Sequence, residues 1–92
     1  MGHTPFGYRI ENGKAVMDEA AASQIRELYK NYLSGLSLTN AAKEAGLNLL
    51  HSGAKRMMLN RHYLGDDFYP AIIDPASFDA VSAELTKRST KL

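Results

Sequence analysis

The sequence predicts one small α+β domain that is mostly helical, with about four helices and one or two short β-hairpins. Its 92 residues suffice for one hydrophobic core and not for two. Apolar residues recur at helical spacing in segments that end at glycines, which is typical of helices. An Asn12-Gly13 pair between two strand-like runs predicts a hairpin, because both central residues of a type I′ turn need positive φ.

The N-terminal half begins with the predicted hairpin at residues 6–17, and the longest helix follows at 18–34. Asp18 is a natural N-cap for this helix, and Gly35 is expected just past its end. Its apolar side chains fall at i, i+3, i+4, i+7 and i+8, so they form one buried stripe. The stripe comprises Ile25, Leu28, Tyr29, Tyr32 and Leu33, preceded by Ala21 and Ala22.

Two short helices are predicted in the middle of the chain. The first spans 38–45, with Ser37 as its cap and Gly46 at its end. Its small-residue face comprises Ala41, Ala42 and Ala45. The second spans 52–59, with Ser52 as its cap, Ala54, Met57 and Met58 facing inward, and Lys55 and Arg56 facing solvent.

The C-terminal third is predicted to hold a second β element and the last helix. Residues 63–73 read as strands around a turn at Asp66-Asp67, which Pro70 restricts to a sheet edge or a bend. Asp74 as N-cap and Pro75 at the first helical position start the helix. Its buried stripe is Phe78, Val81 and Leu85, and residues 87–92 are expected to fray. Most aromatic side chains are at core spacing, so we expect them to be buried.

Composition excludes several classes of function. The chain has no cysteine and three scattered histidines, so we expect no disulfide, metal or cofactor. No Ser/His/acid arrangement and no phosphate-binding loop is present, which predicts a domain without catalytic activity. No apolar run reaches the roughly 20 residues of a membrane span, and no signal peptide is evident. We therefore expect a soluble, cytoplasmic domain with no membrane partner.

The distribution of charge points toward nucleic acid. Residues 45–65 contain no Asp or Glu but include Lys55, Arg56 and Arg61. Together with the two short helices and Gly46 between them, this predicts a helix-turn-helix-like unit with a local positive face for phosphate. The alternative is an ordinary solvated helix surface. Lys and Arg total 11 against 10 acids, and this balance argues mildly against strong independent affinity for DNA.

Different roles are expected within the predicted DNA-contact set. Lys55 and Arg56 would reach base edges or flanking phosphates from the candidate recognition helix. His51 and Ser52 lie at its N-terminus, where backbone N–H groups favour a phosphate, although Ser52 can equally be only a cap. The remaining members are expected to meet the DNA backbone, with plain helix surface as the alternative for Asn40 and helix termination for Asn60. They are Thr39, Asn40, Lys43, Asn60 and Arg61.

Four short motifs, each occurring once, are distributed over nearly the whole chain. They are Phe6-Gly7-Tyr8-Arg9, Tyr32-Leu33-Ser34-Gly35, Tyr63-Leu64-Gly65 and the segment from Pro70 to Phe78. In order and spacing they resemble the recombinase domain of large serine recombinases, which follows the catalytic domain in phage integrases and transposon resolvases. The resemblance implies a bacterial, phage or mobile-element domain that binds the attachment-site half next to the crossover without cutting it. Its implied partners are duplex DNA and the recombinase catalytic domain of the full-length protein.

Two other functions fit the same residues. One is a small helix-turn-helix transcription regulator, which a catalytic domain encoded upstream would exclude. The other is a protein-interaction domain with no DNA role, which salt-sensitive retention on DNA would exclude.

Overall fold

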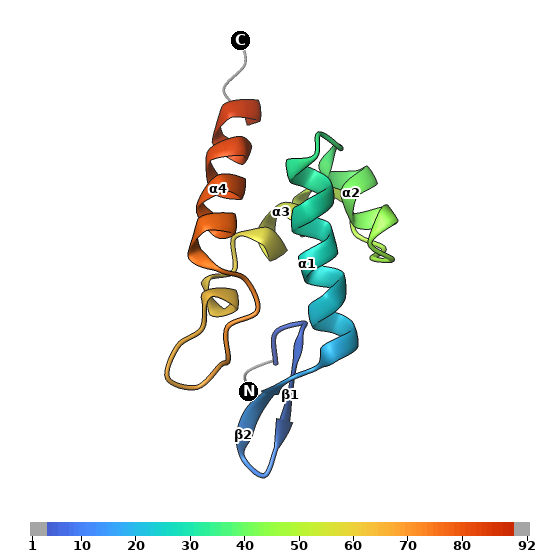
Figure 1. The fold of residues 1–92 in the computed structure, drawn as a ribbon. Coiled ribbons are helices and arrows are strands. Elements are labelled where there is room, and N and C mark those ends of the chain that lie inside the picture. Colours follow the sequence, from blue (N-terminus) through green and yellow to red (C-terminus); the bar gives the residue numbers. More distant parts are fainter. Residues whose placement is uncertain (1–3, 90–92) are drawn as a thin grey trace.

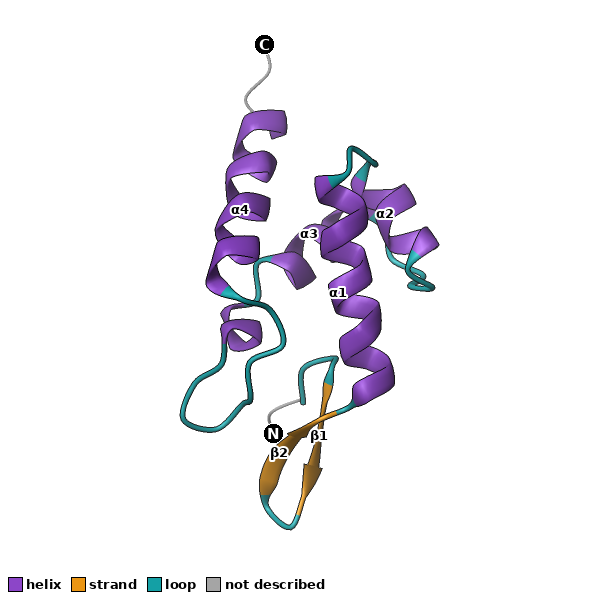
Figure 2. Ribbon diagram, viewed as in Figure 1, coloured by secondary structure: helices purple, strands orange, loops and turns teal. Residues whose placement is uncertain are grey.

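The computed structural model describes residues 4–89, which form one hairpin, four α-helices and one short 3₁₀ helix (Figure 1). The elements in chain order are β1 (Tyr8–Glu11), β2 (Lys14–Met17), α1 (Glu19–Leu33), α2 (Leu38–Glu44), α3 (His51–Met58), η1 (Arg61–Leu64) and α4 (Pro75–Ser89). Figure 2 shows that helices make up most of the body and that the hairpin projects from one end of it. The predicted α+β, mostly helical fold is confirmed. The predicted fraying is wrong for residues 87–89, which continue α4 with Arg88 bonded to Leu36 and Tyr32, and residues 90–92 lie outside the described residues.

The hairpin has the turn that its sequence predicts. β1 and β2 pair antiparallel with Tyr8 opposite Met17, and the turn residues Asn12 and Gly13 have φ of 54° and 76°. Tyr8 is buried and links the hairpin to the C-terminal half, because its single O–H lies within hydrogen-bond distance of the carbonyl oxygens of His62 (2.8 Å) and Pro70 (2.6 Å). These bonds matter because an isolated hairpin is marginal in water.

Gly7 allows the hairpin to sit close to α1. A Cβ at this position would lie 2.6 Å from Ile25 Cδ1 and 2.9 Å from Ile72 Cδ1, and the backbone φ is +105°. The positive φ therefore favours glycine where the chain enters β1, and a larger side chain would also displace the ends of the two isoleucine side chains.

The core lies between α1 and the three later helices. Ile25, Leu28, Tyr29 and Tyr32 of α1 are buried, as predicted. Leu33 was wrongly placed in this stripe: 42% of it is exposed, and it lines a shallow depression instead. Lys30, Ile72, Ile73 and Ser77 also line this open depression, so Leu33 is only partly covered.

The predicted caps of three helices are present. The carboxylate of Asp18 accepts from the Ala21 N–H of α1 (3.3 Å), and the hydroxyl of Ser37 accepts from the Asn40 N–H of α2 (3.2 Å). Asp74 accepts from the Ser77 N–H (3.0 Å) at the start of α4. Each bond satisfies a main-chain donor that the first turn of a helix leaves free. Along α4, the predicted stripe of Phe78, Val81 and Leu85 is buried in the core.

The predicted second β element at 63–73 is wrong. Residues 61–64 form η1, and an irregular loop follows. The main-chain N–H and C=O groups of this segment make local and long-range hydrogen bonds instead of pairing as β-strands. The Asn60 side chain caps η1, and the carbonyl of Tyr63 accepts from the N–H groups of both Ile72 and Ile73 (2.9 Å each). Asp66 accepts from the N–H groups that follow it in the loop, those of Phe68 and Tyr69.

Ser52 does not cap α3, contrary to prediction. The helix begins one residue earlier, at His51, with Leu50 at the N-cap position and no side-chain cap hydrogen bond. Ser52 is therefore inside the first turn and exposed to solvent.

Two aromatic side chains also depart from the expected core. Phe6 and Phe68 are exposed, in the segment before β1 and in the loop after η1. Among residues 4–89, no helix is long and apolar enough to cross a membrane.

Candidate nucleic-acid interface

α3 is held in place from its inner side. Ala54 and Met58 lie one helical turn apart and are fully buried. The Tyr29 hydroxyl donates to the carbonyl of Met58 (2.5 Å), and α2 packs along the same helix. The two short helices and their connection at residues 45–50 thus contain the parts of the predicted helix-turn-helix-like unit, with a longer turn than usual. Ser52 and Arg56, on the opposite side of α3, are left exposed.

The cations of this unit lack acidic partners. Within residues 4–89 the ion pairs are Arg9–Glu11, His62–Asp66 and Arg88–Glu84. Lys43, Lys55, Arg56 and Arg61 take part in none of them. Lys55, Arg56 and Arg61 of the acid-free stretch, and Lys43 just before it, are therefore cations without an ion-pair partner among the described residues, and unpaired cations favour binding to phosphates.

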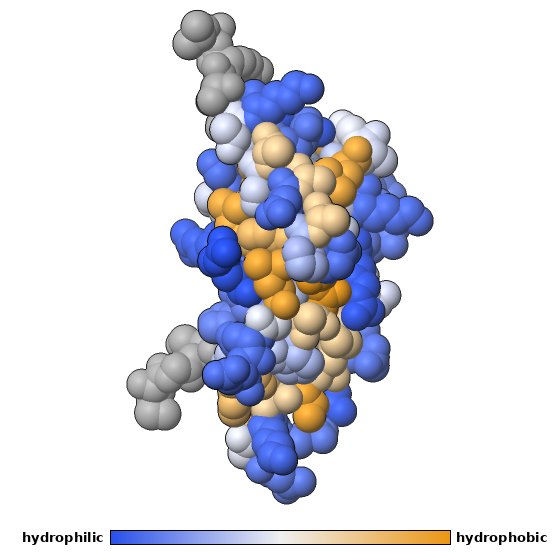
Figure 3. Space-filling model, turned by 60° about the vertical axis from the view of Figure 1, so that its left-hand side comes forward, coloured by the Kyte–Doolittle hydropathy of each residue, from blue (hydrophilic) through white to orange (hydrophobic). Residues whose placement is uncertain are grey.

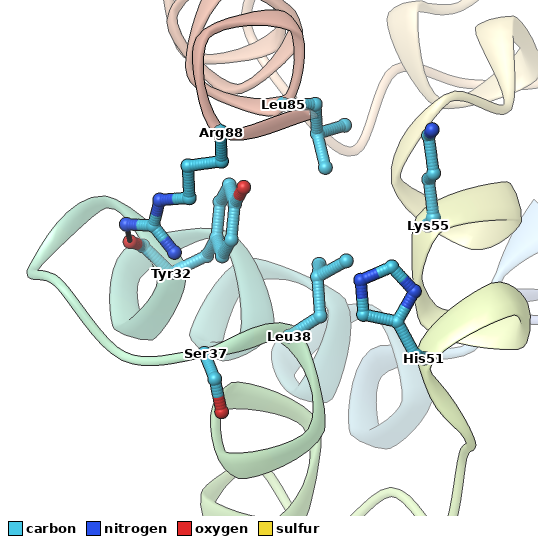
Figure 4. A pocket seen from close by; sticks show the side chains of 7 residues that line it. All are labelled: Tyr32, Ser37, Leu38, His51, Lys55, Leu85 and Arg88. Atoms are coloured by element: carbon cyan, nitrogen blue, oxygen red, sulfur yellow. Dashed lines mark hydrogen bonds between the residues drawn. The ribbon is translucent and has the colours of Figure 1, made fainter. Parts of the chain in front are cut away.

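Five residues of the predicted contact set line two separate hollows beside α3, and the other four, Thr39, Asn40, Lys43 and Ser52, line neither. Arg56, Asn60 and Arg61 line a shallow groove of about 700 Å³, which is otherwise mainly apolar. The other lining residues are Phe6, Leu49, Gly53, Met57, Leu59 and Tyr63. His51 and Lys55 line a separate pocket of about 230 Å³ between α2, α3 and α4 (Figure 4).

Lys55 differs from the expectation that it points freely to solvent. It is half-buried, because the pocket that it lines also includes Leu38 of α2 and Leu85 of α4. Arg56 is exposed as predicted. Arg61 is exposed too, and its guanidinium lies 5.7 Å from the centre of the Phe78 ring, within the range of a cation–π contact.

The predicted contacts on α2 are accessible. Thr39, Asn40 and Lys43 are all exposed, and Lys43 is in the last turn of the helix. The main-chain N–H of Asn40 donates to the Ser37 hydroxyl, and the Asn40 side chain takes no part in this capping bond. Asn60 does not belong to α3: its side chain accepts from the His62 N–H (3.0 Å) and caps η1.

Arg88 is a structural residue that sequence reasoning missed. Its guanidinium donates to the carbonyls of Leu36 (2.9 Å) and Tyr32 (3.3 Å) and lies 4.0 Å from the centre of the Tyr32 ring. It also pairs with Glu84 (2.7 Å). The i, i+4 spacing of Glu84 and Arg88 was the only local signal, and the bonds to the end of α1 join residues distant in sequence.

Hydrogen bonds in the loop after η1 lower the pKa of the Asp66 carboxyl group. Main-chain N–H groups of Tyr69 and Phe68, with a further bond from His62, hold the pKa of Asp66 below its usual value. The carboxylate is thus charged near neutral pH and accepts the two main-chain bonds that fix the course of the loop. The Nδ1 atom of the His62 ring lies 3.1 Å from the same carboxylate.

The surface also carries apolar side chains. Figure 3 shows them along the middle of one face, between polar side chains on both sides. Among the large apolar residues, Leu50 is 81% exposed, Phe6 41% and Leu59 40%. Phe6 and Leu59 border the groove that Arg56 lines, so this groove combines apolar and cationic character.

No family model, curated protein or solved structure matches this chain. Among residues 4–89, no group of three or more His, Cys, Asp or Glu side chains is placed to hold a metal ion. The function is therefore inferred from the arrangement of the side chains themselves.

Proposed function

We propose that this chain is the DNA-binding domain of a site-specific serine recombinase, which binds the attachment-site half beside the crossover without cutting it. The observation that carries the proposal is the set of cations on and around α3 that no acid neutralises. Arg56 is exposed on α3, Arg61 follows it on η1, and Lys43 is exposed on the preceding helix. In a helix-turn-helix protein the second helix contacts bases and the first contacts the backbone, so α3 would read the duplex and α2 would position it.

The order of motifs along the chain supports the recombinase assignment over other DNA-binding proteins. Two of these motifs have a structural role here. Gly7 permits the close approach to Ile25, and the Tyr63 carbonyl accepts two main-chain bonds from Ile72 and Ile73. Cutting and rejoining of DNA would belong to a catalytic domain elsewhere in the full-length protein. A reading frame that continues upstream into a serine catalytic domain would support this assignment, and one that does not would favour a transcription regulator.

The formal net charge of +1 limits the strength of binding. Because a few unpaired cations face a backbone of phosphates, we expect moderate affinity with a clear salt dependence. The logarithm of the binding constant should fall with the logarithm of the salt concentration, by about 0.9 for each phosphate neutralised. Fluorescence anisotropy of a labelled duplex at several salt concentrations measures this slope. No binding at low salt, or an affinity that ignores salt, would overturn the proposal.

One observation favours a second function, that of a protein-interaction domain. The groove beside Arg56 exposes Phe6 and Leu59, and apolar patches with a polar rim are common at protein interfaces. The two functions differ in their response to substitution. Phe6→Ser should weaken a protein complex and leave non-specific duplex affinity unchanged, whereas Arg56→Gln should weaken binding to the duplex.

A further inference from the structure

The pocket between α2, α3 and α4 has the character of an anion site. Figure 4 shows His51 and Lys55 on one wall, Arg88 against Tyr32 on the opposite wall, and open space between them. Leu38 and Leu85 supply apolar surface, and Ser37 completes the lining. Among the residues that the structure describes, no Asp or Glu lines this pocket.

Two of its three basic side chains are available to a ligand. His51 and Lys55 are one turn apart on α3, so they lie on the same side of the helix. Within the described part of the chain, neither takes part in an ion pair or a side-chain hydrogen bond. Arg88, by contrast, is already bonded to Glu84 and to the carbonyls of Tyr32 and Leu36. Its role in the pocket is therefore to form a fixed wall.

The size of the pocket limits the ligand. Its volume of about 230 Å³ is below the roughly 300–1,000 Å³ of sites for drug-sized molecules. The pocket volume is still several times the roughly 30 Å³ that one water molecule occupies in the liquid. The pocket thus suits a single small anionic group better than a whole nucleotide.

We propose that this pocket binds one phosphate group through Lys55 and His51. A lysine ammonium is a frequent phosphate ligand because it acts as a compact point charge, and the imidazole supplies a second N–H donor. The phosphate can come from the DNA backbone or from a free phosphate in solution. The DNA source rests on the proposed function, since it makes Lys55 a backbone-positioning contact beside the α3 surface that carries Arg56.

The first experiment adds inorganic phosphate to the protein at constant ionic strength and follows the histidine ring signals by NMR, with acetate as the comparison anion. We expect the His51 signals to shift and saturate with phosphate and to shift less with acetate, while the His62 signals stay still. Lys55→Gln should weaken phosphate binding roughly tenfold, because one charge-assisted contact is lost. The matched control is Lys30→Gln, which removes an exposed lysine of α1 outside the pocket and should bind phosphate like the parent.

The second experiment separates the two sources. If the DNA backbone supplies the phosphate, Lys55→Gln should lower the salt slope of duplex binding by about 0.9, and Lys30→Gln, on α1, should not. Since Lys55 is half-buried, His51→Gln at an exposed position repeats the salt-slope measurement without changing packing, and it should also lower the slope if the pocket holds a DNA phosphate. A His51 shift with phosphate but no change in slope identifies free phosphate as the source. Phosphate binding in a protein that fails to bind duplex would overturn the proposed function and leave the pocket assignment intact. No His51 shift and no change in slope would overturn the pocket assignment.

Discussion

The hydroxyl of Tyr29 donates a hydrogen bond of 2.5 Å to the main-chain carbonyl of Met58, and this bond joins the middle of α1 to the last residue of α3. Both residues are buried. Burial raises the pKa of the Tyr29 phenol, so the group stays protonated and remains a donor at neutral pH. The exposed face of α3 is therefore oriented by a bond made in the core.

Replacing Tyr29 by Phe should destabilise the domain by about 1–3 kcal/mol, because the buried Met58 carbonyl loses a hydrogen-bond donor. Urea unfolding measures the change. Tyr69→Phe is the matched control, since Tyr69 is half-buried and makes no side-chain hydrogen bond in the described structure. Equal stability of the two variants would mean that the bond does not hold α3.

Phe78→Ala should cost about 3–5 kcal/mol, because the ring is buried in the hydrophobic core and also faces the Arg61 guanidinium. A small domain has little stability in reserve, so much of the protein should unfold at 37 °C. Phe68→Ala, at an exposed aromatic, should change stability by less than about 0.5 kcal/mol. Thermal unfolding followed by circular dichroism compares them, and a small effect at Phe78 would show that α4 does not close the core.

Stability should fall at alkaline pH. Burial raises the pKa of Tyr8 and of Tyr63 from 10.0 to about 12. A group whose pKa is higher in the folded state contributes its full stabilisation below its unfolded pKa and loses it as pH rises through the folded value. The loss should therefore occur between about pH 10 and 12 in urea unfolding. Tyr8→Phe should make this pH dependence shallower, and an identical profile would show that the Tyr8 hydroxyl is not buried in the folded protein.

Removing the Arg88 guanidinium should destabilise the fold although Arg88 belongs to the last turns of α4. Arg88→Gln loses the bonds to Leu36 and Tyr32, at a cost of about 1–3 kcal/mol. Arg9→Gln is the control, because Arg9 also pairs with a glutamate but is exposed, where such pairs contribute about 0–1 kcal/mol. Similar costs would indicate that Arg88 is only a surface charge.

The elements that could be predicted from the sequence are those with local causes. The Asn12-Gly13 turn and the caps Asp18, Ser37 and Asp74 act within a few residues of themselves. The segment after η1 could not be predicted, because its course depends on bonds between distant residues. Tyr8 reaches the carbonyl of Pro70, a separation of 62 positions that no local pattern reveals.

The candidate site was predictable to the same degree. The lack of acids around α3 is a property of the sequence, and the exposure of Arg56 follows from helical spacing. The partial burial of Lys55 was not predictable, since it depends on where α4 places Leu85. The division of the cations between a groove and a pocket likewise arises from packing between elements.

The central claim is that α3 binds duplex DNA through its unpaired cations. The most direct test compares two double variants that each remove two positive charges, which changes the formal net charge from +1 to −1. Lys55→Gln/Arg56→Gln alters α3, and Lys14→Gln/Lys30→Gln alters exposed lysines on β2 and α1. Circular dichroism should show that both variants remain folded.

The salt dependence of duplex binding is then measured for the parent and both variants. If Lys55 and Arg56 each neutralise a phosphate, the slope of the α3 variant should be smaller by about 1.8, and that of the control variant should match the parent. Net charge is the same in the two variants, so any difference between them reports the location of the contact. A control variant that weakens binding as much as the α3 variant does, or more, would contradict the claim that α3 is the DNA-binding helix.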